Sequence, residues 1–362
     1  PSPVSNSKGY AAERRCLLEG LPQKGWAIRL LAQDGGAPSV IDPKFEARFR
    51  EWGQTKVSDE AVMLLNVPIG WIHQRRWPHN LLIRTMFETD GVPAFAVPFL
   101  QKASEVIVPT EFHVNIFSQA GIPLEKLRIV PGGIDTDIFH PGNKSFSEPR
   151  PIRFISIFDW QERKGWRELL RAWALAFHRY DGVELQIKLT TLNLPYANVR
   201  NDVEDELKCI GKTLDDCAPV RFISELWTTE RLAEFYRQAD AFVLPTRGEG
   251  WGRPIVEAMA SGLVVLATDW SAPHTYLDSA WSLPLAYRLV TVPADDSLQI
   301  FRLSQGHRWA QVEIDDLIGK MRWVANHSQE AQQLGRKARE VALRYSLPAV
   351  IDRLHKTLER WT

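Results

Sequence analysis

Two carboxylates, Glu249 and Glu257, stand eight positions apart in a stretch whose other residues favour binding of an anion. The run FVLPTRGEGWGRPIVEAMASGLVVLATD, residues 242–269, predicts a buried strand, a loop, a short helix that starts near Pro254, and a second strand. The loop contains three glycines: Gly248, Gly250 and Gly252. The N–H groups and the dipole at the start of a helix attract negative charge, and glycines let a ligand approach the backbone. Because carboxylates accept hydrogen bonds from hydroxyls, the pattern predicts an anion flanked by two polyols, which describes a nucleotide-sugar.

A plainer interpretation of the same residues is a glycine-rich turn, with Glu249 in solvent and Glu257 on an exposed helix face. The E-x7-E spacing alone is common and would support either interpretation. Its place between a buried strand and a capped helix favours the binding site.

Short apolar runs alternate with helical patterns along the chain, which predicts parallel sheets built from βαβ units. Runs such as AFVL and LVVLA are typical of strands buried on both faces. The expected strands are 27–32, 81–86, 105–108, 127–130, 152–157, 184–190, 220–223, 241–244 and 264–268. The expected helices lie near 10–18, 111–120, 164–178, 228–237 and 254–261, with three more after residue 311, the last near 348–361.

The length of 362 residues suits two domains. Pro, Gly, Asn and Ser cluster between Pro131 and Pro151, and we interpret this segment as a linker. The expected domains are residues 1–140 together with the terminal helix 346–362, and residues 150–345. A Rossmann-like domain normally opens with a strand before its glycine turn, here at Gly9, so that strand is either missing from the chain or very short.

Composition excludes several classes of protein. The 44 basic and 44 acidic residues leave no basic excess for nucleic acid, and no apolar run is long enough to span a membrane. The three cysteines, Cys16, Cys209 and Cys217, do not have the spacing of a zinc site and are expected to be reduced thiols. The sequence therefore predicts a cytoplasmic protein, with peripheral association at a membrane left open.

The segment around Glu249 resembles the signature of the retaining glycosyltransferases of family 4, the group 1 glycosyltransferases. Three other stretches resemble the same family in the right order: EVIVPTEFHVNIFSQAGIP with LRIVPGGIDTDIFHP, FISIFDWQERKGWRELLRAW, and RFISELWTTERLAEFYRQADAFVLP. The resemblance runs from about Glu105 to the C-terminus and is thinner from Gly9 to Asp90. It implies the α/β GT-B fold, in which two Rossmann-like doubly wound domains face each other across a cleft, with a helical C-terminal segment.

The resemblance also implies roles for individual residues. Glu249 would contact hydroxyls of the donor sugar, Glu257 would hold the ribose, and Arg163 with Lys164 would grip the diphosphate. Further donor contacts are implied for Gly9, Gly250, Trp251, Gly252, Ile223 and Glu225, the last two in the segment where the nucleobase meets backbone.

Two departures from the family pattern concern charge and acid–base groups. Many members have an arginine five or six residues before the lysine, where this chain has Phe158 and Asp159, so Arg163 must supply that charge or it is absent. Many also have a histidine near the donor sugar, after a strand comparable to LLIRT. Here Glu88 resembles a variant of one branch, and His73 is a weaker candidate, since a lone histidine is more often structural.

The sequence predicts no metal site and no cofactor. The D-x-D at Asp135–Asp137 matches a cation-binding motif of another glycosyltransferase class, but it follows Pro131-Gly132-Gly133 and is interpreted as turn chemistry. No His/Cys cluster suggests zinc.

The implied function is a retaining hexosyltransferase that moves a hexose from a nucleotide-diphosphate sugar, of the UDP-glucose or GDP-mannose type, to a saccharide, lipid-linked or small-molecule acceptor. Arg163, Lys164 and the helix start at Pro254 would stabilise the departing diphosphate without metal. The alternative is a catalytically degenerate nucleotide-sugar-binding protein, favoured by the missing upstream arginine and the doubtful first strand. An epimerase would need acid–base residues that the sequence does not offer, and an oxidoreductase would need a G-x-G-x-x-G after a strand.

Overall fold

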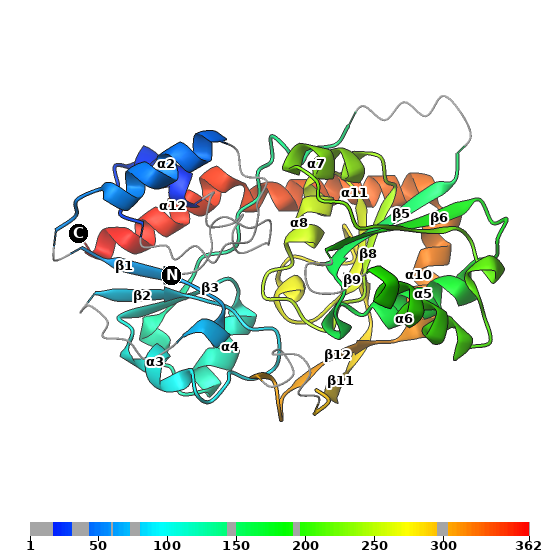
Figure 1. Ribbon diagram of the computed structural model, residues 1–362, viewed down its shortest axis with the longest axis horizontal. Coiled ribbons are helices and arrows are strands. Elements are labelled where there is room, and N and C mark those ends of the chain that lie inside the picture. The colour runs from blue at the N-terminus through cyan, green and yellow to red at the C-terminus, as the bar shows by residue number, and fades with distance from the viewer. Residues whose placement is uncertain are drawn as a thin grey trace. The chain divides into compact units, whose positions relative to one another are not determined.

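The computed structural model describes residues 17–30, 43–58, 61–72, 80–142, 150–190, 196–294 and 303–361. The chain divides into two compact units (Figure 1). The first unit contains Pro1–Gly133, Val292–His307 and Tyr345–Thr362, and the second contains Ile134–Thr291 and Arg308–Arg344. The sequence placed all of 150–345 in the second domain, whereas Val292–His307 packs with the first unit.

The first unit is built on a parallel sheet of four strands in the order β1-β2-β3-β4. The strands are β1 (Met63–Asn66), β2 (Leu81–Arg84), β3 (Glu105–Val108) and β4 (Leu127–Ile129). The helices of this unit are α2 (Pro43–Gln54), α3 (Val97–Lys102), α4 (Glu111–Gln119) and α12 (Leu347–Leu358). Side chains alternate across β2 and β3, so each face of the sheet has its own apolar cluster.

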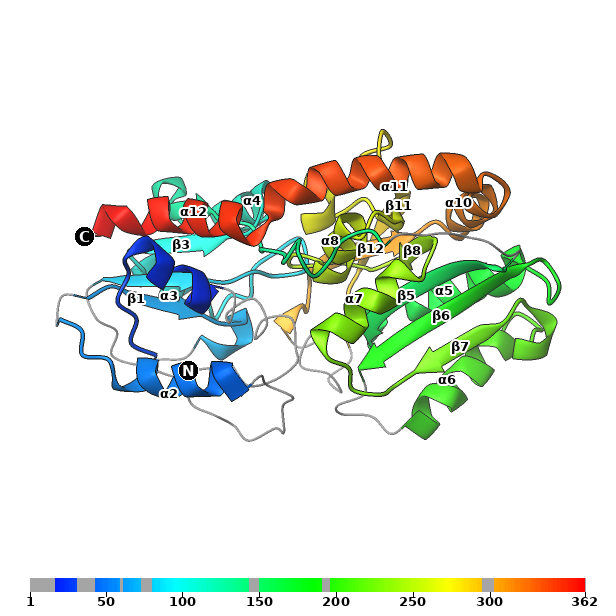
Figure 2. The same cartoon turned by 90° about the horizontal axis from the view of Figure 1, so that it is seen from above.

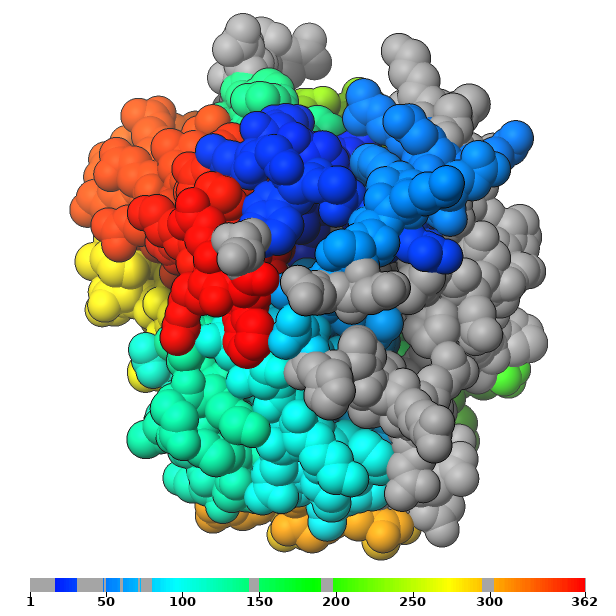
Figure 3. All heavy atoms as spheres, turned by 90° about the vertical axis from the view of Figure 1, so that its left-hand side faces the viewer, coloured from blue at the N-terminus to red at the C-terminus, as the bar shows by residue number. Residues whose placement is uncertain are grey.

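Helices cover both faces of this sheet. On one face, Ile83 and Val106 share a cluster with Leu100 of α3 and Phe117 of α4. On the other face, Leu82 and Ile107 pack with residues near the N-terminus and with α12, through Leu17, Leu21, Val350, Leu354 and Leu358. Figures 2 and 3 show α12 beside the segment that begins at residue 17, although the two are far apart in the sequence. The helical spacing of the apolar residues in α12 therefore places them on one side of the helix, and this side packs on the sheet.

The second unit is built on a parallel sheet of six strands in the order β10-β9-β8-β5-β6-β7. The strands are β5 (Ile152–Asp159), β6 (Val183–Thr190), β7 (Val220–Ile223), β8 (Ala241–Leu244), β9 (Val264–Thr268) and β10 (Leu283–Leu285). The helices are α5 (Trp166–Ala176), α6 (Tyr196–Lys208), α7 (Thr229–Arg237), α8 (Arg253–Ala260), α10 (Ile314–Asn326) and α11 (Ser328–Ala342). Helix α5 packs on α6 and α10, and α8 packs on α7 and α11, which is the doubly wound arrangement with helices on both faces.

The strand order of the second unit locates its ligand crevice. The chain runs outward from β5 to β7 on one side and then from β8 to β10 on the other. In open α/β sheets, ligands bind at the carboxyl ends of the strands where the order reverses. That switch point lies between β5 and β8, so the loops after these two strands are expected to form the site.

The structure differs from the sequence expectation in the less buried elements. Residues 27–30 of the expected first strand are not in a strand; the Leu30 N–H donates to the carbonyl of Trp52, in α2, rather than to a sheet. Strand β1 and the antiparallel pair β11 (Tyr287–Thr291) and β12 (Arg308–Val312) were not predicted; the side chains of β1 are only partly buried, and β11 and β12 have no continuous apolar run. In the part of the chain that the structure describes, no helix combines the length and apolar character needed to cross a membrane.

Candidate functional site

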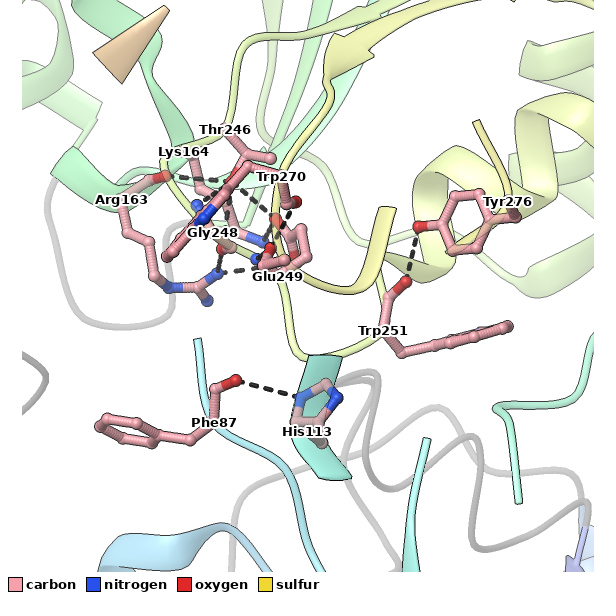
Figure 4. A network of polar contacts seen from close by, with 11 residues as sticks. Phe87, His113, Arg163, Lys164, Thr246, Gly248, Glu249, Trp251, Trp270 and Tyr276 are labelled. Atoms are coloured by element: carbon pink, nitrogen blue, oxygen red, sulfur yellow. Dashed lines mark hydrogen bonds and ion pairs between the residues drawn. The ribbon is translucent and has the colours of Figure 1, made fainter. Parts of the chain in front are cut away.

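The loops after β5 and β8 bring together three charged residues that the sequence singled out. The ammonium of Lys164 lies 2.6 Å from Glu249 Oε1, and Arg163 Nη1 lies 3.6 Å from Glu249 Oε2 (Figure 4). Arg163 also donates to the carbonyl of Gly248. The three side chains are only 7–12% exposed. The structure therefore buries two cations and one carboxylate at the switch point of the second unit.

Local geometry explains why Lys164 reaches Glu249. Gly165 follows Lys164 in the left-handed conformation, with φ of 69°, and ends a short 3-10 turn before α5 begins. An added Cβ at Gly165 would lie 1.9 Å from the carbonyl oxygen of Pro245. Glycine thus lets the β5–α5 turn lie directly against the loop that follows β8.

Hydrogen bonds join the loops after β5 and β8, and one more attaches the second loop to β12. The Arg247 N–H donates to the Arg163 carbonyl over 2.7 Å, and the Arg247 carbonyl accepts from Ala310 N–H over 2.9 Å. The Thr246 hydroxyl lies 3.1 Å from the Arg163 carbonyl and 3.0 Å from Glu249 Oε1. These contacts fix the distance between the cations and the carboxylate.

The backbone of Glu249 is held from the end of β9. Its N–H donates to the Ser271 hydroxyl over 2.9 Å, and that hydroxyl donates to the Trp270 carbonyl over 2.6 Å. Ser271 has φ of 59°, a strained conformation for a residue other than glycine. Such strain is typical of positions that the surrounding structure holds for function. Neither Ser271 nor Thr246 was predicted, since no sequence pattern marks a serine for positive φ.

The electrostatics of the cluster keep Glu249 ionised. Burial alone would raise its pKa, but the charges of Lys164 and then Arg163 outweigh burial, and the net pKa lies below the ordinary value. A carboxylate with a lowered pKa is a poor proton acceptor at neutral pH. Glu249 is therefore suited to accept hydrogen bonds and to orient the cations rather than to move a proton.

The glycine-rich turn begins α8 as the sequence predicted. Gly252 has φ of 80°, and a Cβ there would lie 2.5 Å from the Tyr276 hydroxyl. That hydroxyl donates to the Trp251 carbonyl over 2.6 Å, and the two aromatic rings meet edge to face (Figure 4). Trp251 is buried, so its ring anchors the turn, and the main chain from Gly250 to Gly252 leads into the start of α8.

The remaining predicted donor residues have separate partners. Glu257, buried in α8, accepts from the Tyr236 hydroxyl over 3.0 Å and pairs with Arg253 over 3.1 Å. Ile223 ends β7 and is buried, while exposed Glu225 accepts from the indole of Trp227 over 3.1 Å. Within the described contacts, the cluster around Glu249 does not include these three residues.

The structure shows what occupies the positions at which the sequence departs from the family pattern, and where the D-x-D motif lies. Phe158 is buried and stacks near Trp160, so it does not provide a polar contact, and Arg163 is the arginine that stands beside Lys164 and Glu249. Asp135 Oδ1 accepts from the N–H groups of Asp137 and Ile138 over 3.0 and 3.1 Å, which confirms its interpretation as turn chemistry. Gly9 and His73 lie outside the described residues.

Glu88 lies in the loop that follows β2 in the first unit, and the residue before it, Phe87, contacts a histidine that sequence reasoning did not identify. His113 is fully buried; its Nδ1 lies 2.8 Å from the Thr110 hydroxyl and its Nε2 lies 3.1 Å from the Phe87 carbonyl (Figure 4). Because a carbonyl only accepts, Nε2 carries the proton and Nδ1 accepts from Thr110. Burial lowers the pKa of His113 to about 3; the bond to Phe87 opposes this shift and the charge of Arg84 adds to it.

We expect the neutral state of His113 to make the first unit acid-sensitive. A histidine with a lowered pKa contributes stability that is complete above its ordinary pKa and is lost as pH falls below it. Between neutral pH and about pH 4.5, His113 should account for about 2–3 kcal/mol of lost unfolding free energy, at 1.36 kcal/mol per pH unit. Urea unfolding of wild type and His113→Asn at both pH values checks this, because the variant should be less stable at neutral pH and depend less on pH.

Exposed His178 provides the control, since His178→Asn should keep the pH dependence of wild type. An equal pH dependence in wild type and His113→Asn would contradict the assignment of a buried neutral imidazole.

Comparison with known proteins agrees with this fold. Residues 150–293 match the family model described as glycosyl transferases group 1. The phosphatidyl-myo-inositol mannosyltransferase of Mycobacterium tuberculosis is 31% identical over 147 residues, which cover 40% of this chain and 35% of that protein. The chain spans between 34% and 39% of the length of the first three curated relatives it matches.

Solved structures resemble most or nearly all of the chain. The sucrose-phosphate synthase of Thermosynechococcus elongatus has a TM-score of 0.65 against this chain, with 16% identity over 98% of this chain and 93% of that one. The HepE protein of Anabaena, solved with UDP and glucose, has a TM-score of 0.59 with 14% identity over 77% of this chain and 71% of that one. The chain therefore has the GT-B fold of two Rossmann-like units and resembles the group 1 glycosyltransferases.

Proposed function

We propose that this chain, whose residues 150–293 match the group 1 glycosyltransferases, transfers a hexose from a nucleotide-diphosphate sugar to an acceptor hydroxyl. The donor is of the UDP-glucose or GDP-mannose type, and the acceptor is a saccharide, a lipid-linked sugar or a small molecule. Transfer retains the anomeric configuration and uses neither metal nor cofactor. The observation that carries the proposal is the buried contact of Arg163 and Lys164 with Glu249 at the switch point of the sheet.

The charges of this cluster suit a diphosphate leaving group. Transfer breaks the bond between the anomeric carbon and the diphosphate oxygen, so negative charge develops on the diphosphate. Two cations and one carboxylate leave the cluster with one net positive charge for that anion. Donors held in place before the reaction stabilise such charge without reorganising, and losing one typically costs about 2.7–4 kcal/mol of barrier.

The carboxylates of Glu249 and Glu257 bind the hydroxyls of the donor. Glu249, ionised and fixed by its backbone, accepts hydrogen bonds from the donor sugar. Glu257 accepts from the ribose while Tyr236 and Arg253 hold its carboxylate in place. Backbone at Ile223 and Glu225 meets the nucleobase, and Gly9 approaches the phosphates. Glu88, in the first unit, meets a hydroxyl of the sugar substrate, and His73 is a weaker candidate for that task.

Nucleotide binding provides the direct test. UDP, GDP and their glucose and mannose conjugates are added to wild type and Glu257→Ala, with and without EDTA, and thermal unfolding is measured. A ligand at about a hundred times its dissociation constant should add about 2.7 kcal/mol of stability and raise the melting temperature by several degrees. We expect one nucleotide to stabilise wild type, independently of EDTA, and Glu257→Ala to lose most of this shift.

Glu330→Ala, an exposed substitution in the first turn of α11, should behave as wild type. No stabilisation by any nucleotide would contradict the proposal. A shift abolished by EDTA would contradict metal independence. Binding without release of nucleotide in the presence of acceptors would favour the degenerate nucleotide-sugar-binding protein.

A further inference from the structure

One imidazole contacts three residues of the loop that carries Glu88. His307 Nδ1 lies 2.9 Å from the hydroxyl of Thr89, a residue with 0% exposure. The imidazole also meets the ring of Phe87 edge to face, with centroids 6.1 Å apart. It lies so close to Gly91 that an added Cβ would be 2.7 Å from Nε2. Contacts with Phe87, Thr89 and Gly91 leave Glu88 between two residues that His307 holds.

His307 is itself fixed by its own segment. Its N–H donates to the Ser304 carbonyl over 3.0 Å, and its carbonyl accepts from Val292 N–H over 2.9 Å. Leu303 packs against the apolar cluster of the first unit. The segment Val292–His307 is inserted between β11 and β12, yet it belongs to the first unit. The chain thus leaves the second unit and places this imidazole on the loop after β2.

The loop is held from a second direction by His113, which bonds to the Phe87 carbonyl over 3.1 Å. The carbonyl of Phe87 therefore contacts one histidine and its ring contacts the other. Two imidazoles from distant segments immobilise the main chain on either side of Glu88. Positioned groups of this kind are decisive in catalysis, since a displacement of about 1 Å can cost about a hundredfold in rate.

We propose that His307 is a positioning residue, whose imidazole fixes the loop from Met86 to Gly91 so that Glu88 is presented to a sugar hydroxyl of the substrate. This inference rests on the proposed transfer reaction. His307 does not touch substrate; it acts through Thr89 and Phe87. Removing it should lower turnover and leave nucleotide binding, a property of the second unit, unchanged.

The same contacts make the loop sensitive to acid. Burial lowers the pKa of His307, and the charge of Asp90, in the loop itself, opposes that shift. The structure therefore holds His307 as a neutral ring. As pH falls below the ordinary range of histidine, protonation places a charge against Phe87 and Gly91, and the loop loses its fixed position. Turnover should consequently decline on the acid side before nucleotide binding does.

The experiment combines three variants in a double-mutant cycle. His307→Ala and Thr89→Val each remove one partner of the hydrogen bond, and the double variant removes both. We expect His307→Ala to lower kcat by about 10–100-fold, with the donor KM and the nucleotide-induced shift of Tm unchanged. The losses in Tm and in kcat should be less than additive, because both substitutions remove the same Thr89–His307 contact. His307→Asn, which retains a polar group near Nδ1, should recover most of the rate and lose the acid limb of the pH profile.

His178→Ala, at an exposed position, is the matched control and should leave every readout unchanged. Additive losses in Tm for Thr89→Val and His307→Ala would overturn the contact. A wild-type kcat in His307→Ala would overturn the positioning role, as would an equal loss of nucleotide binding. If wild type transfers no sugar, the proposed function fails, and the cycle in Tm still decides whether His307 holds the loop.

Discussion

Glu249→Ala should abolish most turnover and, at the same time, make the protein more responsive to nucleotide. In the unliganded protein the Glu249 carboxylate is the counter-charge that lies 2.6 Å from Lys164 and 3.6 Å from Arg163. Removing one partner of a buried ion pair typically costs about 3–5 kcal/mol, because the other charge stays buried and uncompensated. The unliganded variant should therefore unfold several degrees below wild type.

A diphosphate restores the missing negative charge. The nucleotide that stabilises wild type should raise the melting temperature of Glu249→Ala by more than it raises that of wild type, since it now neutralises both cations. Turnover should still fall by about 10²–10³, because the sugar hydroxyls lose their acceptor and the cations lose their orientation. Glu249→Gln keeps the shape without the charge and should show the same increase in nucleotide response.

Two measurements check this result: melting temperature with and without nucleotide, and initial rate of nucleotide release from the sugar donor. The exposed Glu330→Ala is the control for loss of a negative charge as such. A smaller nucleotide response in Glu249→Ala than in wild type would show that Glu249 does not act as the counter-charge. An active Glu249→Ala would remove it from the proposed site.

The pH dependence of the contact between Glu249 and the two cations follows from the direction in which the pKa of Glu249 is shifted. The pKa of Glu249 is lowered in the folded protein, so its contribution to stability is present above the ordinary pKa of a carboxyl and is lost only as pH falls through the lowered value. The cluster stays intact throughout the neutral range. Acid sensitivity near the ordinary pKa of histidine should instead come from the first unit, where the buried His113 and the half-buried His307 are held as neutral rings.

Strands β8 and β9 were predicted to the residue, and both are buried on both faces of the sheet. Strands β8 and β9 have exposures near zero along their whole length, and their uninterrupted apolar runs reflect that environment. Strand β10 contains Pro284, and β11 is mostly exposed, so neither leaves an apolar run that marks a strand. Pairing with a neighbour, rather than composition, defines these edge elements.

The candidate site shows the same division between local and tertiary information. Glu249 was identified from the glycines and the helix start beside it in the sequence, and Arg163 and Lys164 from the resemblance of their segment to the family. Thr246, Ser271 and Tyr276 act through residues that folding brings close. Thr246 contacts Arg163 83 positions away, Ser271 contacts Glu249 22 positions away, and Tyr276 contacts Trp251 25 positions away. His307 contacts a threonine 218 positions away, and no pattern in the sequence connects the two.

Gly165→Ala should disrupt both stability and catalysis through a single methyl group. Gly165 combines φ of 69° with an approach to Pro245 that would place a Cβ 1.9 Å from its carbonyl oxygen and 2.7 Å from its carbonyl carbon. The left-handed conformation costs an alanine about 1–2 kcal/mol, and overpacking typically adds about 1–3 kcal/mol. Because the obstacle is backbone and not a flexible side chain, we expect a total loss of about 3 kcal/mol or more in unfolding free energy.

The added methyl group of Gly165→Ala should displace the backbone in a defined direction. To relieve the contact, the turn at Gly165 must move away from Pro245, and that turn carries Lys164 while Pro245 leads to Glu249. The 2.6 Å contact between Lys164 and Glu249 must then lengthen, so turnover should fall by about a hundredfold, as expected for misplacement of about 1 Å. Urea unfolding and initial rates measure the two effects separately.

Gly182→Ala separates the clash from the backbone strain. Gly182 has φ of 67°, nearly that of Gly165, but an added Cβ there meets nothing within 4 Å. Its substitution should cost only the conformational part, about 1–2 kcal/mol, with turnover unchanged. If Gly165→Ala were no more harmful than Gly182→Ala, the close approach of the two loops would not be what holds Lys164 against Glu249. A clear excess in both readouts would show that the absence of one methyl group sets the geometry of the proposed diphosphate site.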